Sequence, residues 1–233
     1  MTRLLDIVRI VNRPDQVEAA YAAEVNWPQG YRLNADARLL LLGASRLIGR
    51  LRGAGSKLSR PEEKSRTALV LGQTFGSLSS YEIFHDSLLA GAAEPLACTL
   101  ALPSVPVSAI GIRFGFCGPS ITVAGGLEVG LLALRDALLL LAQDRCDHVI
   151  TGCWYLPSAT TASSGLPDYA KLVLIALRAG DKRKATMAVA REMTTWCGGA
   201  GAATCVDLLD EWLCDNATAF APSGDLVLGE EYV

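Results

Sequence analysis

The stretch FGFCGPSITVAGGLEVG (Phe114–Gly130) divides into a turn, a short strand and the start of a helix. The glycines and the proline of Phe114–Pro119 are typical of a turn, and the β-branched content of Ser120–Ala124 predicts a strand. The apolar run that follows predicts a helix over Gly126–Arg145. A strand that breaks sharply into a helix N-terminus is a common place for a nucleophile, because the helix dipole stabilises negative charge there. Leu127 occupies that place here, and its side chain has no such chemistry.

The junction between the predicted strand and the predicted helix, Gly125–Glu128, is called the elbow below. The segments on either side of it predict a layered α/β fold. Continuous apolar runs of strand length occur at Thr67–Gly72, His148–Cys153 and Lys171–Leu177, as expected of strands that are buried on both faces. Alternation of such strands with helices is typical of a sheet covered by helices. The remaining predicted elements are helices from the Asn12–Asp15 cap to about Val25, at 35–51 and at 204–215, loops at 52–66 and 157–168, and a strand at 225–229.

The composition limits the classes of function. Of the 233 residues, 51% are hydrophobic and 19% are charged, with a mean hydropathy of +0.30, which predicts surface that is buried against a partner chain. The net charge of −3 gives no overall attraction to nucleic acid or to an anionic membrane. The longest apolar run, Val129–Ala142, is interrupted by two charged residues and is too short to span a bilayer. No positively charged leader precedes an apolar run at the N-terminus, so we expect a cytoplasmic protein.

Seven cysteines are spread along the chain without a CxxC pair, and there are only two histidines. The odd number and the lack of histidine argue against a zinc site. We therefore expect no metal and no cofactor, and we interpret the cysteines as reduced thiols that mostly pack as small hydrophobic side chains. They are Cys98, Cys117, Cys146, Cys153, Cys197, Cys205 and Cys214.

The run Leu102–Leu134 resembles the centre of the β-ketoacyl synthases, a family of the thiolase fold. That family carries an Asn/Ser-x-Pro pair, an isoleucine, Phe-Gly-x-x-Gly-Pro and a Thr-Val strand, followed by a nucleophilic cysteine and Gly-x-x-Ala-Leu. The strand and the helix with a Tyr-Glu start within Leu71–Glu82 are similar to the family as well. The matching residues in the central run are Ser104, Pro106, Ile110, Phe114, Gly115, Gly118, Pro119, Thr122, Val123, Gly130, Ala133 and Leu134.

The resemblance is best over residues 67–152 and implies a thiolase-like layered α/β fold. It implies one truncated ketosynthase-like domain over residues 1–233, the N-terminal half of a β-ketoacyl synthase with an incomplete C-terminal lobe. Leu127 stands where the family has its cysteine, and leucine can be neither acylated nor ionised. The His-Gly-Thr and Asn-Phe-Gly-Phe-Gly motifs, which bear the two catalytic histidines of the family, do not occur in the sequence. The resemblance thus implies a degenerate synthase with no catalytic residues.

Degenerate synthases of this kind act as chain-length factors, which pair with an active ketosynthase and shape its acyl tunnel. The sequence is similar to the short forms in aryl polyene type pathways, although aromatic polyketide systems usually have glutamine at the position of Leu127. The expected partners are a full-length ketosynthase and, through it, an acyl carrier protein. Gly126, Leu127 and Glu128 are expected to line the tunnel. The expected partner interface is the apolar strand of Ser120, Ile121, Thr122, Val123 and Ala124, which lacks the Lys or Pro that would block edge pairing.

Two other classes of function stay open. Cys153 or Cys117 could be a relocated nucleophile, with His85 or His148 as its base, in an independent acyltransferase or hydrolase. Packed thiols are the favoured interpretation, since no Cys–His pairing is visible in the sequence, and we expect His148 to be a partly exposed linker residue. The other class is a scaffold that recruits carrier proteins without touching the acyl chain.

Two charged features also have two interpretations. Glu128 is better explained by favourable placement near a helix N-terminus, about 0.3–1 kcal/mol, than by catalysis. The arginines of the second helix could meet an acidic carrier protein, but a solvated helix face is favoured. They are Arg38, Arg46, Arg50 and Arg52.

Overall fold

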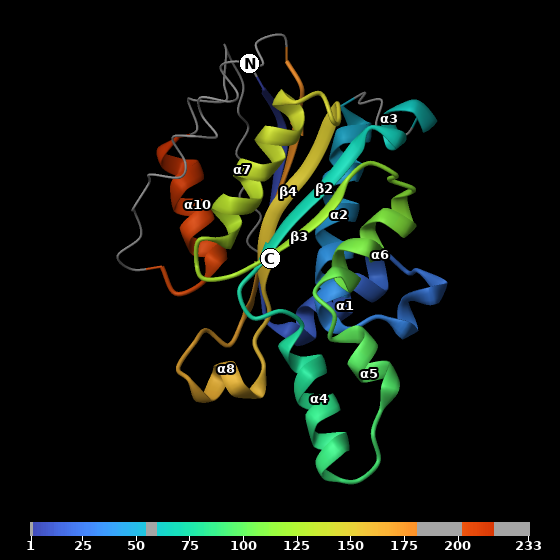
Figure 1. Cartoon of the computed structure of the whole chain (residues 1–233), viewed down its shortest axis with the longest axis vertical. Coiled ribbons are helices and arrows are strands. Elements are labelled where there is room, and N and C mark those ends of the chain that lie inside the picture. Colours follow the sequence, from blue (N-terminus) through green and yellow to red (C-terminus); the bar gives the residue numbers. More distant parts are fainter. Residues whose placement is uncertain (1, 55–59, 181–201, 217–233) are drawn as a thin grey trace.

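The computed structural model describes residues 2–54, 60–180 and 202–216, which form a mixed five-stranded sheet with helices on both faces (Figure 1). The strands are β1 (Arg3–Asn12), β2 (Thr67–Gln73), β3 (Ser120–Ala124), β4 (His148–Tyr155) and β5 (Ala170–Arg178). They lie in the order β1-β5-β4-β2-β3. β2 pairs in parallel with β3 and β4, whereas β5 is antiparallel to β4 and β1.

One helical layer consists of α1 (Pro14–Glu24), α2 (Ala35–Gly53) and α6 (Ser104–Phe114). The consecutive leucines Leu39–Leu42 of α2 are fully buried, so this helix is enclosed on several sides by the sheet and its neighbouring helices. The side chain of Asn34 caps its N-terminus. Burial of this kind stabilises a helix more than its intrinsic propensity does.

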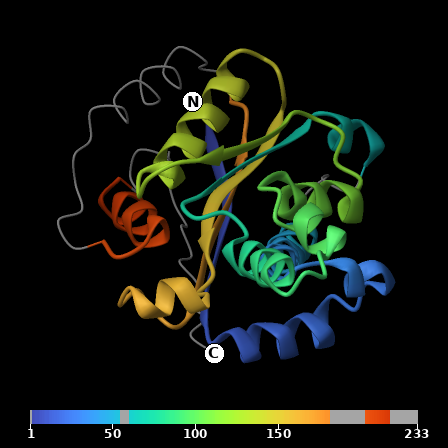
Figure 2. The same ribbon diagram turned by 60° about the horizontal axis from the view of Figure 1, so that its bottom comes forward.

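The second layer lies on the opposite face of the sheet and consists of α7 (Val129–Ala142) and α10 (Cys205–Asp215) (Figure 2). Leu134 and Leu138 of α7 are almost completely buried against the sheet. α10 packs beside α7 on β4 and begins with a capping box around Thr204. This layer carries the elbow that the sequence analysis singled out.

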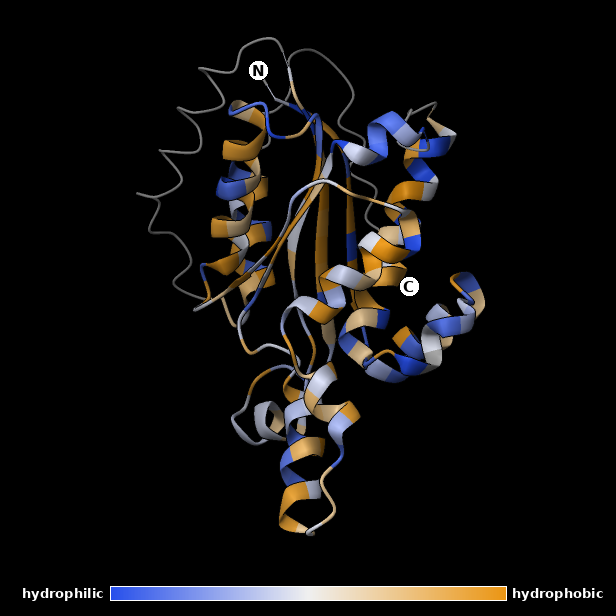
Figure 3. Cartoon of the chain, turned by 45° about the vertical axis from the view of Figure 1, so that its right-hand side comes forward, coloured by the Kyte–Doolittle hydropathy of each residue, from blue (hydrophilic) through white to orange (hydrophobic). Residues whose placement is uncertain are grey.

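Shorter helices connect these elements: a 3-10 helix η1 (Pro28–Arg32), α3 (Pro61–Ser65), α4 (Leu78–Leu89), α5 (Pro95–Leu100) and α8 (Ala159–Ser163). α4 and α5 form an arm that projects beyond the carboxyl ends of the parallel strands (Figure 1). Hydrophobic segments lie along this arm (Figure 3), and its large apolar side chains are between 43% and 75% exposed. They are Tyr81, Ile83, Leu88, Leu89 and Leu96. No helix in the described ranges is long and apolar enough to cross a membrane.

The expected layered α/β fold is confirmed, and the strands predicted from apolar runs, β2, β4 and β5, are buried along almost their whole length. β1 is not predicted from the sequence. This strand lies at the edge of the sheet, and Arg3, Asp6 and Arg9 interrupt its apolar pattern.

Several predicted boundaries are wrong. α7 begins at Val129 rather than at Gly126, because residues 125–128 form a turn. The predicted loops at 52–66 and 157–168 contain the short helices α3 and α8. The first of these has a proline at its start, and the second has a capping box at Ser158. The strand predicted at 225–229 lies outside the described residues.

Candidate functional site

The elbow is an exposed turn at the carboxyl end of β3. Gly126, Leu127 and Glu128 lie together in this turn, and the Leu127 side chain is 39% exposed. Glu128 holds the N-cap position of α7, but its side chain makes no capping hydrogen bond. The hydroxyl of Thr74, from the loop after β2, donates to the carbonyl oxygen of Gly126 at 3.4 Å. The three residues expected to line a tunnel are therefore adjacent and lie at the surface of this chain.

Glycines allow α7 to sit directly against the sheet behind this turn. A Cβ on Gly72 of β2 would lie 2.5 Å from the carbonyl oxygen of Val129, closer than real Cβ atoms approach. A Cβ on Gly130 would lie 2.7 Å from the Cys153 sulfur and 3.0 Å from Leu209 Cβ. The orientation of the elbow thus depends on two positions that have no side chain.

β3 is at the edge of the described sheet, hydrogen-bonded to β2 and to no other described strand. Ser120 and Ala124 are exposed, and Ile121 and Val123 are only partly buried against the α7 layer. The backbone groups on the outer side of this strand are therefore available to a further strand. The five residues expected to meet a partner form one continuous edge.

The cysteines proposed as alternative nucleophiles differ in their surroundings. Cys153 is completely buried, and burial is the main cause that raises the pKa of its thiol. A thiol with a raised pKa is a poor nucleophile. Cys117 is exposed, and its thiol donates to the carbonyl oxygen of Gly115 at 3.6 Å.

The expectation that the cysteines pack as small hydrophobic side chains holds for only part of the set. Cys146, Cys153 and Cys205 are buried, and burial raises the pKa of Cys146 to about 12. Cys98, Cys117 and Cys214 are exposed. Cys197 lies outside the described residues.

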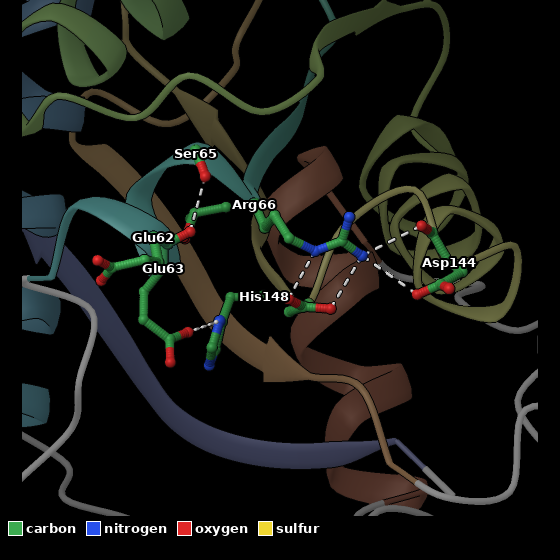
Figure 4. Close-up of polar contacts among 8 residues, drawn as sticks. Glu62, Glu63, Ser65, Arg66, Asp144 and His148 are labelled. Atoms are coloured by element: carbon green, nitrogen blue, oxygen red, sulfur yellow. Dashed lines mark hydrogen bonds and ion pairs between the residues drawn. The ribbon is translucent and has the colours of Figure 1, made fainter.

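The prediction that His148 is a partly exposed linker residue is wrong. It is the buried first residue of β4, and its Nδ1 lies 3.0 Å from a carboxylate oxygen of Glu63 (Figure 4). Burial lowers its pKa, against the opposing effect of Glu63. Cys153 is five residues further along an extended strand, about 16 Å away at about 3.3 Å per residue, so His148 cannot act as its base. His85 is exposed on α4, 3.4 Å from its neighbour Asp86.

The Arg66 side chain lies at the same end of the sheet as His148. Its guanidinium donates to both carboxylate oxygens of Asp147 at 2.6 and 3.0 Å and to Asp144 at 3.1 Å (Figure 4). This cluster lies where β2 and β4 begin, whereas the elbow lies where the parallel strands end. We interpret the cluster as structural.

A buried polar cluster, which the sequence does not predict, lies at the carboxyl ends of β2 and β4. The indole Nε1 of Trp154 donates to Asp36 Oδ1 at 2.8 Å, and burial raises the pKa of Asp36 to about 6. Gln73 and Ser77 are buried beside them, and the side-chain polar atoms of Gln73 have no partner within the described residues. Asp36, the one acidic residue of α2, stands in the first turn of the helix just before its leucine run, and this is the only sequence signal for the cluster.

Three of the four arginines of α2 pair with acidic groups of this chain, and the fourth, Arg52, is exposed. Arg38 lies 2.7 Å from Glu18. Arg46 lies 2.7 Å from Glu24, and its hydrogen bond lowers the pKa of that carboxyl. Arg50 lies 3.4 Å from Asp6. These contacts join α2 to α1 and β1, so a role within the fold explains the three arginines without a carrier protein.

A cavity of about 420 Å³ lies away from the elbow, between β1, β5 and α10. Charged pairs line it: Lys171 with Asp207, and Arg9 with Asp210 at 2.6 Å. The Lys171 ammonium also lies 5.0 Å from the centre of the Tyr169 ring. Carboxylates of this chain therefore neutralise the charges of Lys171 and Arg9.

No protein-family model matches the sequence, and no curated protein matches it. Solved structures do match. The ishigamide ketosynthase/chain length factor is 24% identical, with a TM-score of 0.57 over 70% of this chain and 49% of that chain. A ketosynthase (ApeO) in complex with its chain length factor (ApeC), from Xenorhabdus doucetiae, is 16% identical, with a TM-score of 0.56 over 76% of this chain and 79% of the matched chain.

A third similar structure is a β-ketoacyl synthase from Burkholderia phymatum STM815. It is 12% identical, with a TM-score of 0.59 over 79% of this chain and 60% of that chain. The chain spans about half the length, 49%, of the matched chain in the ishigamide ketosynthase/chain length factor structure. It therefore has the layered α/β fold of the ketosynthase structures and matches part of their length.

Proposed function

We propose that this chain is a non-catalytic, chain-length-factor-like partner of an active ketosynthase in fatty-acid or polyketide biosynthesis. The observation that carries the proposal is Leu127, in the turn that joins β3 to α7. In the family that the sequence resembles, a cysteine at this point becomes the acyl-carrying thiolate. A leucine gives the elbow an apolar side chain and no nucleophile.

The surface around the elbow suits an obligate partner. Among the described strands only β2 pairs with β3, which leaves the outer edge of β3 for a partner, and the α4–α5 arm exposes several large apolar side chains. Exposed apolar surface of this extent is typical of a protein–protein interface. Obligate interfaces bury more than about 2,000 Å² in total, so we expect the complex to cover both the edge and the arm.

The acyl tunnel would run beside Leu127, at the boundary with the partner. Leu127 is only partly covered by its own chain, so a partner would complete the wall around it. Gly126 and Glu128 would flank it in the same turn. The comparisons support this proposal through structures that contain a ketosynthase with its chain length factor.

Co-expression with the cognate full-length ketosynthase tests the proposal. We expect a stable 1:1 complex in size-exclusion chromatography. After incubation with an acyl-carrier thioester, intact-protein mass spectrometry should find the acyl group on the ketosynthase and not on this chain. An acyl adduct on this chain, or condensation by this chain alone, would instead indicate an independent enzyme.

A further inference from the structure

Two buried cysteines from distant parts of the chain meet between β4 and α10. Cys153 is near the end of β4, Cys205 is the first residue of α10, and both are at most 1% exposed. The Cys153 thiol donates to the carbonyl oxygen of Cys205 at 3.4 Å, and the Cys205 thiol donates to that of Trp154 at 3.5 Å. The two side chains also interact with each other, and this interaction affects the pKa of both thiols.

The surrounding elements hold this pair in place. Gly130 of α7 faces it, and a Cβ there would lie 2.7 Å from the Cys153 sulfur and 3.2 Å from the Cys205 carbonyl oxygen. The N-terminus of α10 is fixed by reciprocal hydrogen bonds between Thr204 and Asp207. The approach of the two cysteines is therefore part of the packing of three elements.

The two thiols are unequal in acidity. The hydrogen bond with Cys153 is the main cause that lowers the pKa of Cys205, and hydrogen bonds with Thr74 lower it further. The pKa of Cys153 is raised, chiefly by burial. Thiolate is the reactive form of cysteine, so these directions favour Cys205 over Cys153 as the first thiol to react with an oxidant.

We propose that Cys153 and Cys205 form a reversible disulfide when the protein meets hydrogen peroxide. The Cys205 thiolate attacks one peroxide oxygen, so that an S–O bond forms, the O–O bond breaks and hydroxide leaves. The Cys153 sulfur then attacks the Cys205 sulfenic acid, an S–S bond forms, and water leaves with the proton of the Cys153 thiol. The sulfur pair loses two electrons, and the peroxide is reduced to water.

This disulfide would tie α10 covalently to β4. Thr74 interacts with Cys205 and also donates to the carbonyl oxygen of Gly126. Thr74 thus connects the cysteine pair to the elbow. The proposal rests on the two cysteines alone and does not depend on the function proposed above.

The test uses the full-length reduced protein. It is treated with hydrogen peroxide, denatured, alkylated with N-ethylmaleimide, digested and analysed by mass spectrometry. We expect a cross-linked peptide pair that contains Cys153 and Cys205, with two fewer alkylated cysteines per chain. Dithiothreitol should restore both alkylation sites.

Single substitutions complete the test. Cys153→Ser and Cys205→Ser should each abolish the cross-link, whereas Cys146→Ser, which removes a buried thiol elsewhere, should leave it at the wild-type yield. The proposal is overturned if wild-type Cys153 and Cys205 are both fully alkylated after the treatment. A cross-link between other cysteines, or a sulfinic acid at Cys205 without a cross-link, would overturn it as well. These outcomes are measured on the wild-type protein, so they test the proposal even if a variant fails to fold.

Discussion

Gly72 of β2 and Val129 of α7 approach so closely that a Cβ on the glycine would lie 2.5 Å from the valine carbonyl oxygen. Val129 is the first residue of α7, so this contact sets the head of the helix directly on β2, between β4 and the edge strand β3. The turn that bears Leu127 immediately precedes it. The position of the candidate site is therefore fixed by a backbone contact rather than by its own side chains.

Gly72→Ala should destabilise the fold, because the backbone at the head of α7 must move away from the new methyl group. We expect a loss of about 1–3 kcal/mol in the free energy of unfolding, as for other overpacked cores. Gly49→Ala is the matched control, since nothing lies within 4 Å of a Cβ at that exposed helical position. It should stabilise the protein by about 0.5–1 kcal/mol. Urea unfolding followed by circular dichroism measures both, and equal effects would contradict the account.

Val123→Asp should abolish the complex with the ketosynthase. A partner strand on the free edge of β3 would bury this position, and an unpaired buried charge costs about 3–5 kcal/mol. Binding is measured by pull-down, after circular dichroism has shown that the variant is folded. Arg50→Ala, which changes a surface position on α2, should bind like the wild type. Wild-type binding by Val123→Asp would contradict the interface assignment.

Asp36 should make stability depend on pH. Its pKa is raised in the folded state, from 3.8 to about 6, so the folded state binds more protons between these values. The contribution of Asp36 to stability therefore falls as the pH rises from about 4 to about 6, and this contribution is constant above that range. The shift corresponds to about 3 kcal/mol. Unfolding curves of the wild type and of Asp36→Asn, which keeps an acceptor for Trp154, should diverge over this range by that amount, and parallel pH profiles would refute the raised pKa.

Leu127→Cys should not create a condensing enzyme. Catalysis in the resembled family also needs two histidines. The histidines of this chain are His85, on the exposed arm, and His148, which is paired with Glu63 at the other end of the sheet. Loss of groups that stabilise a transition state costs several kcal/mol. Release of CO₂ from a malonyl thioester measures the activity, with the cognate ketosynthase as positive control. Turnover by the purified variant alone would show that other residues supply the chemistry.

The strands at the centre of the sheet could be predicted because continuous apolar runs have few other uses at that length. β1 could not, because an edge strand with Arg3 and Asp6 has no clear pattern. The place of Leu127 between β3 and α7 also follows from the sequence, since the turn, strand and apolar run are local signals, but the start of the helix at Val129 rather than Gly126 does not.

Long-range pairings could not be foreseen. Asp36 and Trp154 are 118 positions apart, and each has an ordinary local context. His148 follows an aspartate and resembles a surface residue in the sequence, but Glu63 and the neighbouring strands bury it. These contacts depend on how the layers are packed, and no local pattern encodes that.

The size of the side chain at position 127 tests the central claim most directly. The complex with the cognate ketosynthase is supplied with carrier protein and malonyl units, and the chain lengths of the products are measured by mass spectrometry. We predict that Leu127→Phe shortens the longest product and Leu127→Ala lengthens or broadens the distribution, while Ile112→Phe, an exposed position on α6, leaves it unchanged. An identical product distribution for all four complexes, each assembled as well as the wild type, would contradict a tunnel that runs beside Leu127.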